Sequence, residues 1–246
     1  MVEIPKEYQR HAKVFSEEEA QQFPPSRPWD HAITLKPDAP DTINCKVYPL
    51  DPKRRVAMRK WLDDMLERGY LHPSKSPITS SMFYVPKKDG DDRPVQDYQI
   101  LNKYTVKDNS PLPNIKQTIA DLVQVFIFTK FDIRWGYNNI RIKRGDEWKA
   151  AFKTPFGVFE LMVMFFGLTN SPATFQMMMN HIFRPLVDKH TPLGTTICVY
   201  MDDIIIGTSS TMAAHISAVH DVLNLLAEHD LYLKPTKCKF HADSID

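Results

Sequence analysis

Strand-like runs of hydrophobic residues recur along this chain, and most of them are short. The most prominent pair, 195–201 and 204–208, is rich in β-branched and aromatic residues and is interrupted only by Asp202 and Asp203. Both runs have the length and apolar character of buried strands, so they predict a hairpin with two acids at its tip. Further strands are predicted at 81–86, 94–98, 126–133, 139–143, 151–154 and 158–161.

A spacing of three or four residues between apolar positions marks the predicted helices. From Met58 to Leu66 the apolar residues fall on one helical face, and Gly69 follows as a stop signal. Ser171 and Pro172 suit the start of a second helix. Other helices are predicted over 216–226 and over 121–123 together with the residues before them.

Helices mixed with antiparallel strands in this way predict an α+β fold. The chain shows no internal repeat and no glycine-rich phosphate loop. Its first 52 residues hold 8 of the 19 prolines, which do not fit helix interiors or central strands. We therefore expect residues 1–52 to form an extended strap.

The acids at the hairpin tip have two interpretations. Aspartate is a common turn residue, so Asp202 and Asp203 could lie in a solvated turn. However, apolar residues flank both acids directly, and two adjacent carboxylates in such surroundings favour a neutralising cation such as Mg²⁺. The strand at 126–133 also carries an acid near its end, Asp132. Three acids on buried strands suggest one carboxylate cluster.

Charge is unevenly distributed along the 246 residues, although the formal net charge is only +1. Residues 1–52 carry 6 Lys and Arg against 9 Asp and Glu, residues 53–107 carry 12 against 7, and residues 108–246 carry 13 against 14. A basic segment beside an acidic one suits a protein that handles phosphates, although a solvated charged surface would have the same composition. Lys87 and Arg93 flank a predicted turn that could be solvated or could grip a polyphosphate.

The sequence predicts no membrane-spanning segment, no secretory signal and no disulfide framework. No stretch approaches the ~18 apolar residues of a membrane span, and the N-terminus lacks the apolar core of a secretory signal. We therefore expect an intracellular protein, in either the cytoplasm or the nucleus. The three cysteines are far apart, and the Cys238-x-x-His241 spacing lacks the second ligand pair of a structural zinc site.

Several motifs together carry a family resemblance. They are Phe131-Asp132-Ile133, the stretch 166–175 and Tyr200-Met201-Asp202-Asp203, accompanied by Trp29-Asp30-His31, Lys87-Lys88-Asp89-Gly90, Asp97-Tyr98, Leu101-Asn102, Pro111-Leu112-Pro113, Gly136-Tyr137, Leu231-Tyr232-Leu233-Lys234 and Lys237-Cys238. Because these motifs occur in the order and at the spacing typical of that family, the chain resembles the reverse transcriptase of gypsy-type long-terminal-repeat retrotransposons.

The resemblance implies a right-hand polymerase fold of fingers and palm, with an antiparallel palm sheet backed by helices and with the thumb absent. The implied domains are a strap at 1–52, fingers at 53–106 and 140–170, and palm at 107–139 and 171–246. The implied function is an RNA-directed DNA polymerase that adds dNTPs to a primer on an RNA or DNA template. A catalytically silent, nucleic-acid-binding remnant is the alternative.

The resemblance also assigns roles to particular residues. Asp132 and Asp202 would bind two Mg²⁺ ions, or Mn²⁺ in their place, with Asp203 completing the cluster and the Ile133 carbonyl assisting. Lys87 and Arg93 would contact the triphosphate of the incoming nucleotide. Tyr137 would exclude a ribose 2′-hydroxyl, and Phe166 would line the nucleotide pocket. Tyr200 and Met201 would contact nucleic acid.

Some positions depart from the family pattern. Gln99 stands where arginine is common, Asn138-Asn139 replace His-Gln, and Phe165 replaces a proline. None of these departures removes an expected metal ligand. The resemblance also implies partners outside this chain, namely the thumb, connection, ribonuclease H and integrase of a polyprotein, and it implies no membrane.

Overall fold

The computed structural model describes residues 4–86, 92–114, 116, 120 and 122–244. The chain divides into two compact units, each with its own core. Unit 1 comprises Met1–Gln22, Ser110–Gly136 and Phe175–Asp246, and unit 2 comprises Phe23–Asn109 and Tyr137–Thr174. The first 52 residues are thus divided between the two units. No helix in the described part of the chain is long and apolar enough to cross a membrane.

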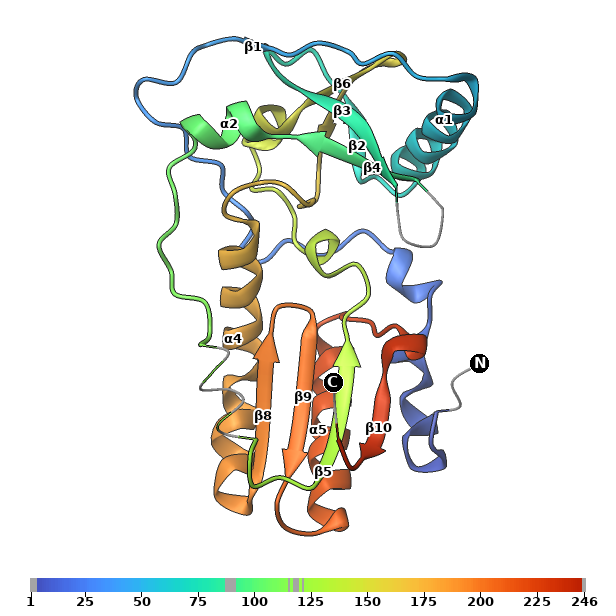
Figure 1. Cartoon of the computed structure of the whole chain (residues 1–246), viewed down its shortest axis with the longest axis vertical. Helices are drawn as coiled ribbons and strands as arrows, with labels where there is room; N and C mark the ends of the chain where they lie inside the picture. The colour runs from blue at the N-terminus through green and yellow to red at the C-terminus, as the bar shows by residue number, and fades with distance from the viewer. Residues whose placement is uncertain (1–3, 87–91, 115, 117–119, 121, 245–246) are drawn as a thin grey trace. The chain divides into compact units, whose positions relative to one another are not determined.

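The sheet of unit 1 is fully antiparallel and has the order β10-β5-β9-β8 (Figure 1). Its strands are β5 (Ile127–Asp132), β8 (Thr195–Tyr200), β9 (Asp203–Thr208) and β10 (Lys239–Ala242). Alternate β9 residues, Ile204 and Ile206, are fully buried, as the period of two in a strand requires. The predicted antiparallel sheet is therefore confirmed.

Helices cover one face of this sheet (Figure 1). They are α4 (Ser171–His190), of which Phe175 onward belongs to unit 1, and α5 (Met212–Glu228). The hydroxyl of Thr211 caps α5 by accepting a hydrogen bond from the Ala214 N–H at 3.2 Å. The predicted apolar stripe of α5 is buried through Val219, Leu223 and Leu226. The helical periodicity therefore identified the face that forms the core.

The N-terminal segment of unit 1 differs from the expected extended strap. Residues Lys6–Phe15 form the 3₁₀ helix η1, and Glu19–Gln21 form η2. The chain has no proline between Pro5 and Pro24, so helical turns are permitted there. Tyr8, Val14 and Phe15 are buried, and the side chain of His11 lies 2.9 Å from that of His220 on α5. The strap prediction was wrong for this segment.

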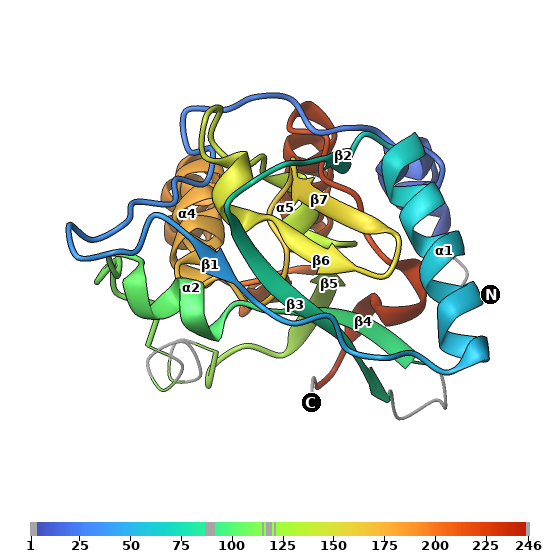
Figure 2. The same cartoon turned by 90° about the horizontal axis from the view of Figure 1, so that it is seen from above.

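Unit 2 contains a mixed sheet, whereas the sequence predicted antiparallel strands (Figure 2). The order is β1-β3-β6-β7-β2, with β4 also paired to β3. The pairs β1/β3 and β3/β6 are parallel and the others are antiparallel. The bounds are β1 (Ile43–Asn44), β2 (Leu71–Pro73), β3 (Ile78–Pro86), β4 (Asp92–Asp97), β6 (Phe152–Thr154) and β7 (Gly157–Leu161).

Helix α1 (Pro52–Glu67) is part of unit 2 and buries one apolar face there, as its apolar spacing predicted (Figure 2). Met58 and Leu62 are almost fully buried, and the Trp61 ring lies 6.2 Å from that of Phe152 in β6. Gly69 adopts a φ of 72°, which suits glycine after a helix end. Unit 2 also holds α2 (Gln99–Tyr104) and η4 (Glu147–Ala150), and η3 (Gly136–Asn139) begins at the unit boundary. Most of the helix predicted before residue 123 lies outside the described residues.

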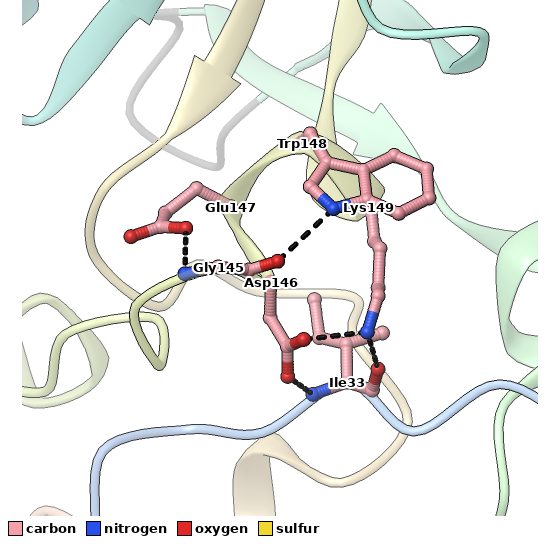
Figure 3. A network of polar contacts seen from close by, with 6 residues as sticks. All are labelled: Ile33, Gly145, Asp146, Glu147, Trp148 and Lys149. Carbon is pink, nitrogen blue, oxygen red and sulfur yellow. Dashed lines mark hydrogen bonds and ion pairs between the residues drawn. The ribbon is translucent and has the colours of Figure 1, made fainter.

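Within unit 2, residues of the predicted strap are hydrogen-bonded to residues 146–149 through Ile33 (Figure 3). The Ile33 N–H donates to Asp146 Oδ2 at 2.8 Å, and Lys149 Nζ donates to the Ile33 carbonyl at 2.8 Å. Asp146 and Lys149 also form an ion pair with each other. Both the N–H and the carbonyl of Ile33 are thereby hydrogen-bonded to side chains of unit 2, and these bonds fix the position of the backbone at this residue.

We expect the stability of the fold to fall in mild acid because of His31. Its ring is buried, Nδ1 lies 2.9 Å from Thr174 Oγ1, and burial lowers its pKa to about 4 against an opposing effect of Asp146. The unfolded chain therefore binds a proton that the folded chain rejects, so stability is lost as pH falls from about 6.5 to about 4. The loss of unfolding free energy that protonation of His31 alone can cause is at most about 3 kcal/mol.

Urea unfolding between pH 7.5 and 4 measures this dependence. His31→Gln keeps a hydrogen-bonding side chain but cannot take up the proton, so its loss of unfolding free energy in acid should be smaller than that of the unsubstituted chain. Equal losses in the two proteins would contradict the assignment to His31.

Candidate active site

The hairpin of β8 and β9 presents acids at its end, with one difference from the prediction. Met201 and Asp202 form the turn, whereas Asp203 is the first residue of β9 and pairs with Tyr200. Met201 adopts the left-handed conformation with φ 54°, which reverses the chain one residue earlier than expected. Asp203 is therefore a strand residue and was wrongly placed in the turn.

Gln176 of α4 holds this turn from both sides. Its side-chain oxygen accepts from the Met201 N–H at 2.8 Å, and its amide nitrogen donates to the Val199 carbonyl at 3.0 Å. Gln176 is 1% exposed, so these bonds form away from water. Sequence reasoning missed this residue, although a glutamine on the apolar face of a predicted helix was a usable signal.

The three aspartates converge at one end of the unit 1 sheet. Asp132 is the last residue of β5 and pairs directly with Asp203 of β9. The Ile133 N–H donates to the Asp202 carbonyl at 2.8 Å, which ties the end of β5 to the turn. We call Asp132, Asp202 and Asp203 the aspartate cluster. The acids from the two separate strand regions therefore lie together, as the sequence predicted.

Gly136 allows the chain after β5 to pass close to this cluster. A Cβ atom at Gly136 would lie 3.1 Å from the Phe175 ring and 3.5 Å from the Asp202 Cβ. The first distance is tighter than most Cβ contacts, so a larger residue would require the Phe175 ring to shift by a few tenths of an ångström. The glycine of the Gly136-Tyr137 motif thus has a packing reason in unit 1.

The electrostatics of the cluster disfavour three bare carboxylates. Burial, together with the charges of Asp132 and Asp203, raises the pKa of Asp202, and Lys237 opposes the rise. Two lysines compensate the other acids. Lys237 Nζ lies 2.8 Å from Asp132 Oδ2, and Lys130 Nζ lies 3.1 Å from Asp203 Oδ2. Sequence reasoning gave neither lysine a role.

The aspartate cluster has the ligand chemistry of a magnesium site but not its arrangement. Carboxylate oxygens are the ligands that Mg²⁺ prefers, and the mutual repulsion within the cluster would be relieved by a divalent ion. In the described part of the chain, however, no group of three or more His, Cys, Asp or Glu residues is arranged to hold a metal ion. The residues fit Mg²⁺ by their chemistry, while lysine contacts occupy oxygens of two of them.

A second group of predicted residues comes together within unit 2. The rings of Tyr137 and Phe166 meet edge to face with centroids 4.7 Å apart, and the Arg93 guanidinium lies 5.8 Å from the Phe166 centroid. Phe166 is 61% exposed, so its ring remains available to a ligand. Lys87, predicted to act with Arg93, lies outside the described residues.

A comparison with known protein families identifies the class of protein. Residues 85–246 match the family model described as reverse transcriptase (RNA-dependent DNA polymerase). This match covers well over half of the chain, and the chain therefore belongs to the reverse transcriptase family. The expected kinship with gypsy-type retrotransposon enzymes is confirmed.

Among curated proteins, the Tf2 transposons of Schizosaccharomyces pombe (strain 972 / ATCC 24843) are similar to this chain. The Transposon Tf2-3 polyprotein is 39% identical over 198 residues, which is 80% of this chain and 14% of that polyprotein. The Transposon Tf2-7 polyprotein is 38% identical over the same shares of both chains. The chain thus spans a small part of these relatives.

Solved structures of foamy viral protease-reverse transcriptase share the fold. The complex with dsDNA has a TM-score of 0.84 at 22% identity and covers 98% of this chain and 48% of the viral one. The complex with an RNA/DNA hybrid has a TM-score of 0.83 at 21% identity and covers 98% of this chain and 32% of the viral one. The predicted α+β polymerase fold is confirmed.

Proposed function

We propose that this chain carries the polymerase site of a retrotransposon reverse transcriptase and adds dNTPs to a primer 3′-hydroxyl on an RNA or DNA template. The observation that carries the proposal is the aspartate cluster at adjoining strand ends, in a chain of the reverse transcriptase family. The nucleic acids bound by the foamy viral neighbours support the choice of substrate.

The cluster supplies the charge that this reaction requires. Asp132 and Asp202 would hold two Mg²⁺ or Mn²⁺ ions, with Asp203 and the Ile133 carbonyl completing the ligands. When bound, the two ions activate the primer hydroxyl and neutralise charge on the leaving diphosphate. The chain fixes its own part beforehand, because the Gln176 bonds and the β5/β9 register hold all three acids on strand or turn backbone.

The residues of unit 2 would recognise the incoming nucleotide. Arg93, with Lys87, would bind the triphosphate, because a guanidinium forms paired hydrogen bonds with phosphate oxygens. Phe166 would offer its exposed ring to the nucleotide. Tyr137, which packs against Phe166 edge to face, would occupy the space that a ribose 2′-hydroxyl needs. Tyr200 and Met201 would contact the nucleic acid.

Tyr137→Val is expected to admit ribonucleotides. Valine lacks the ring that would exclude the 2′-hydroxyl, so the ratio of kcat/KM for dNTP over rNTP should fall by at least about tenfold. Tyr137→Phe keeps the ring and should retain the discrimination of the unsubstituted chain. Steady-state incorporation of one dNTP and the matching rNTP measures both ratios, and an unchanged ratio in Tyr137→Val would place discrimination elsewhere.

Primer extension on an RNA template with Mg²⁺ tests the proposed function directly. The chain should be compared with a longer one that also carries the thumb, connection and ribonuclease H proposed to accompany it in a polyprotein. Clamping the duplex contributes much of the rate by positioning the primer end, so the longer chain should be faster. Absence of incorporation by both chains would support a silent nucleic-acid-binding remnant instead.

A further inference from the structure

Two lysines beside the aspartate cluster each contact one oxygen of a carboxylate that the proposed function assigns to metal ions. Lys237 Nζ donates to Asp132 Oδ2 at 2.8 Å, and Lys130 Nζ lies 3.1 Å from Asp203 Oδ2. The side chain of Asp132 is 11% exposed, so its charge is costly without a partner. An ammonium group and a divalent ion cannot both fill the same coordination position.

The backbone brings Lys237 to this position through a series of defined bonds. The Arg134 N–H donates to the Tyr232 carbonyl at 2.7 Å, and the Lys234 N–H donates to the Asp132 carbonyl at 3.0 Å. The short 3₁₀ helix η6 (Pro235–Lys237) follows at once. The segment that carries Lys237 is therefore hydrogen-bonded to the strand end that carries Asp132, and the ion pair is not a chance encounter of two mobile side chains.

Lys130 reaches the cluster from within the sheet. It lies two residues before Asp132 on β5, so both side chains project from the same face of the strand. Asp132 pairs directly with Asp203 across β5 and β9, so Asp203 is the diagonal cross-strand neighbour of Lys130. The Lys130 ammonium can therefore reach the Asp203 carboxylate. Two cations from different elements thus balance two of the three acids.

We propose that Lys237 and Lys130 stand in for divalent cations at the aspartate cluster, and that metal binding exchanges their ammonium groups for the ions. This inference rests on the proposed function. It accounts for a feature that the reaction alone does not explain, namely that the described residues include the expected acids but not an arrangement ready to hold a metal. It also implies that the lysines stabilise the metal-free fold and compete with the metal.

Thermal unfolding of Lys237→Met in EDTA and in saturating Mg²⁺ tests the exchange. In EDTA the variant should melt several degrees below the unsubstituted chain, because Asp132 is left buried without a counter-ion. In Mg²⁺ this deficit should disappear, because the ion replaces the lysine. A merely structural lysine would lower the melting temperature equally in both conditions, and that result would overturn the proposal.

Direct metal binding supplies the second measurement. Titration of Mn²⁺ followed by electron paramagnetic resonance should show about three-fold to tenfold tighter binding to Lys237→Met, since the ion no longer displaces an ammonium group. Lys237→Gln and Lys130→Met should change in the same direction. Lys234→Met removes one positive charge three residues away and serves as the control for long-range electrostatics, with a smaller change expected.

The outcomes separate this inference from the proposed function. If the unsubstituted chain binds Mn²⁺ and Asp202→Asn does not, the metal site stands. If Lys237→Met then binds Mn²⁺ no more tightly than Lys234→Met, only the exchange is refuted. If none of these proteins binds Mn²⁺, both the metal site and the exchange are refuted.

Discussion

Replacing Asp202 by asparagine is expected to abolish nucleotide incorporation while leaving the fold intact. The substitution removes one negative charge from the proposed metal ligands, and a loss of about 10³-fold or more in kcat is expected when charge stabilisation of this kind is removed. Stability should be unchanged or slightly higher, because burial and two neighbouring acids already raise the Asp202 pKa. Asparagine relieves that repulsion without changing the shape of the turn.

Single-turnover primer extension and thermal unfolding measure the two effects of Asp202→Asn. Asp243→Asn is the matched control, because it makes the same chemical change at an exposed position outside the cluster. It should retain full incorporation. An Asp202→Asn protein that incorporates nucleotides at the unsubstituted rate would remove the basis for assigning catalysis to this cluster.

Phe131→Ala is expected to cause the largest loss of stability among single substitutions in unit 1. Phe131 is 0% exposed, and its ring packs against Phe240 of β10 at 5.5 Å and Phe15 of η1 at 6.5 Å between centroids. Truncation leaves a cavity where three elements meet, and such substitutions cost about 3–5 kcal/mol. Asp132 is the next residue, so the loss would also loosen one proposed metal ligand.

Urea unfolding gives this free energy, and Phe126→Ala provides the comparison. Phe126 directly precedes β5 but is 53% exposed, so its truncation should cost well under 1 kcal/mol, about as much as other surface substitutions. Equal losses at the two positions would mean that the Phe131 contacts do not support the sheet.

Local periodicity was enough to predict the elements that carry the aspartate cluster. The runs at 195–201 and 204–208 predicted buried strands because they are rich in β-branched and aromatic residues. Asp132 lies near the end of a similar run, so the sequence alone predicted that these acids converge. The α1 and α5 stripes followed from apolar spacing in the same way.

Features set by long-range pairing could not be read from the sequence. Lys237 and Asp132 are 105 residues apart in the chain, and nothing near either residue indicates the other. The Gln176 bonds to the hairpin turn and the parallel pairing of β1 with β3 are of the same kind. Sequence separation hides such contacts because each depends on the packing of whole elements rather than on local backbone preference.

The hairpin turn between β8 and β9 shows both what the local sequence predicts and what only the tertiary structure decides. The sequence by itself determined that two strands meet beside a pair of aspartates, because backbone and side-chain preferences act over a few residues. Only the tertiary structure decided that Met201 takes the left-handed position and that Asp203 joins β9 opposite Asp132. That choice depends on the register with β5 and on the Gln176 side chain, and both arrive from elsewhere in the fold.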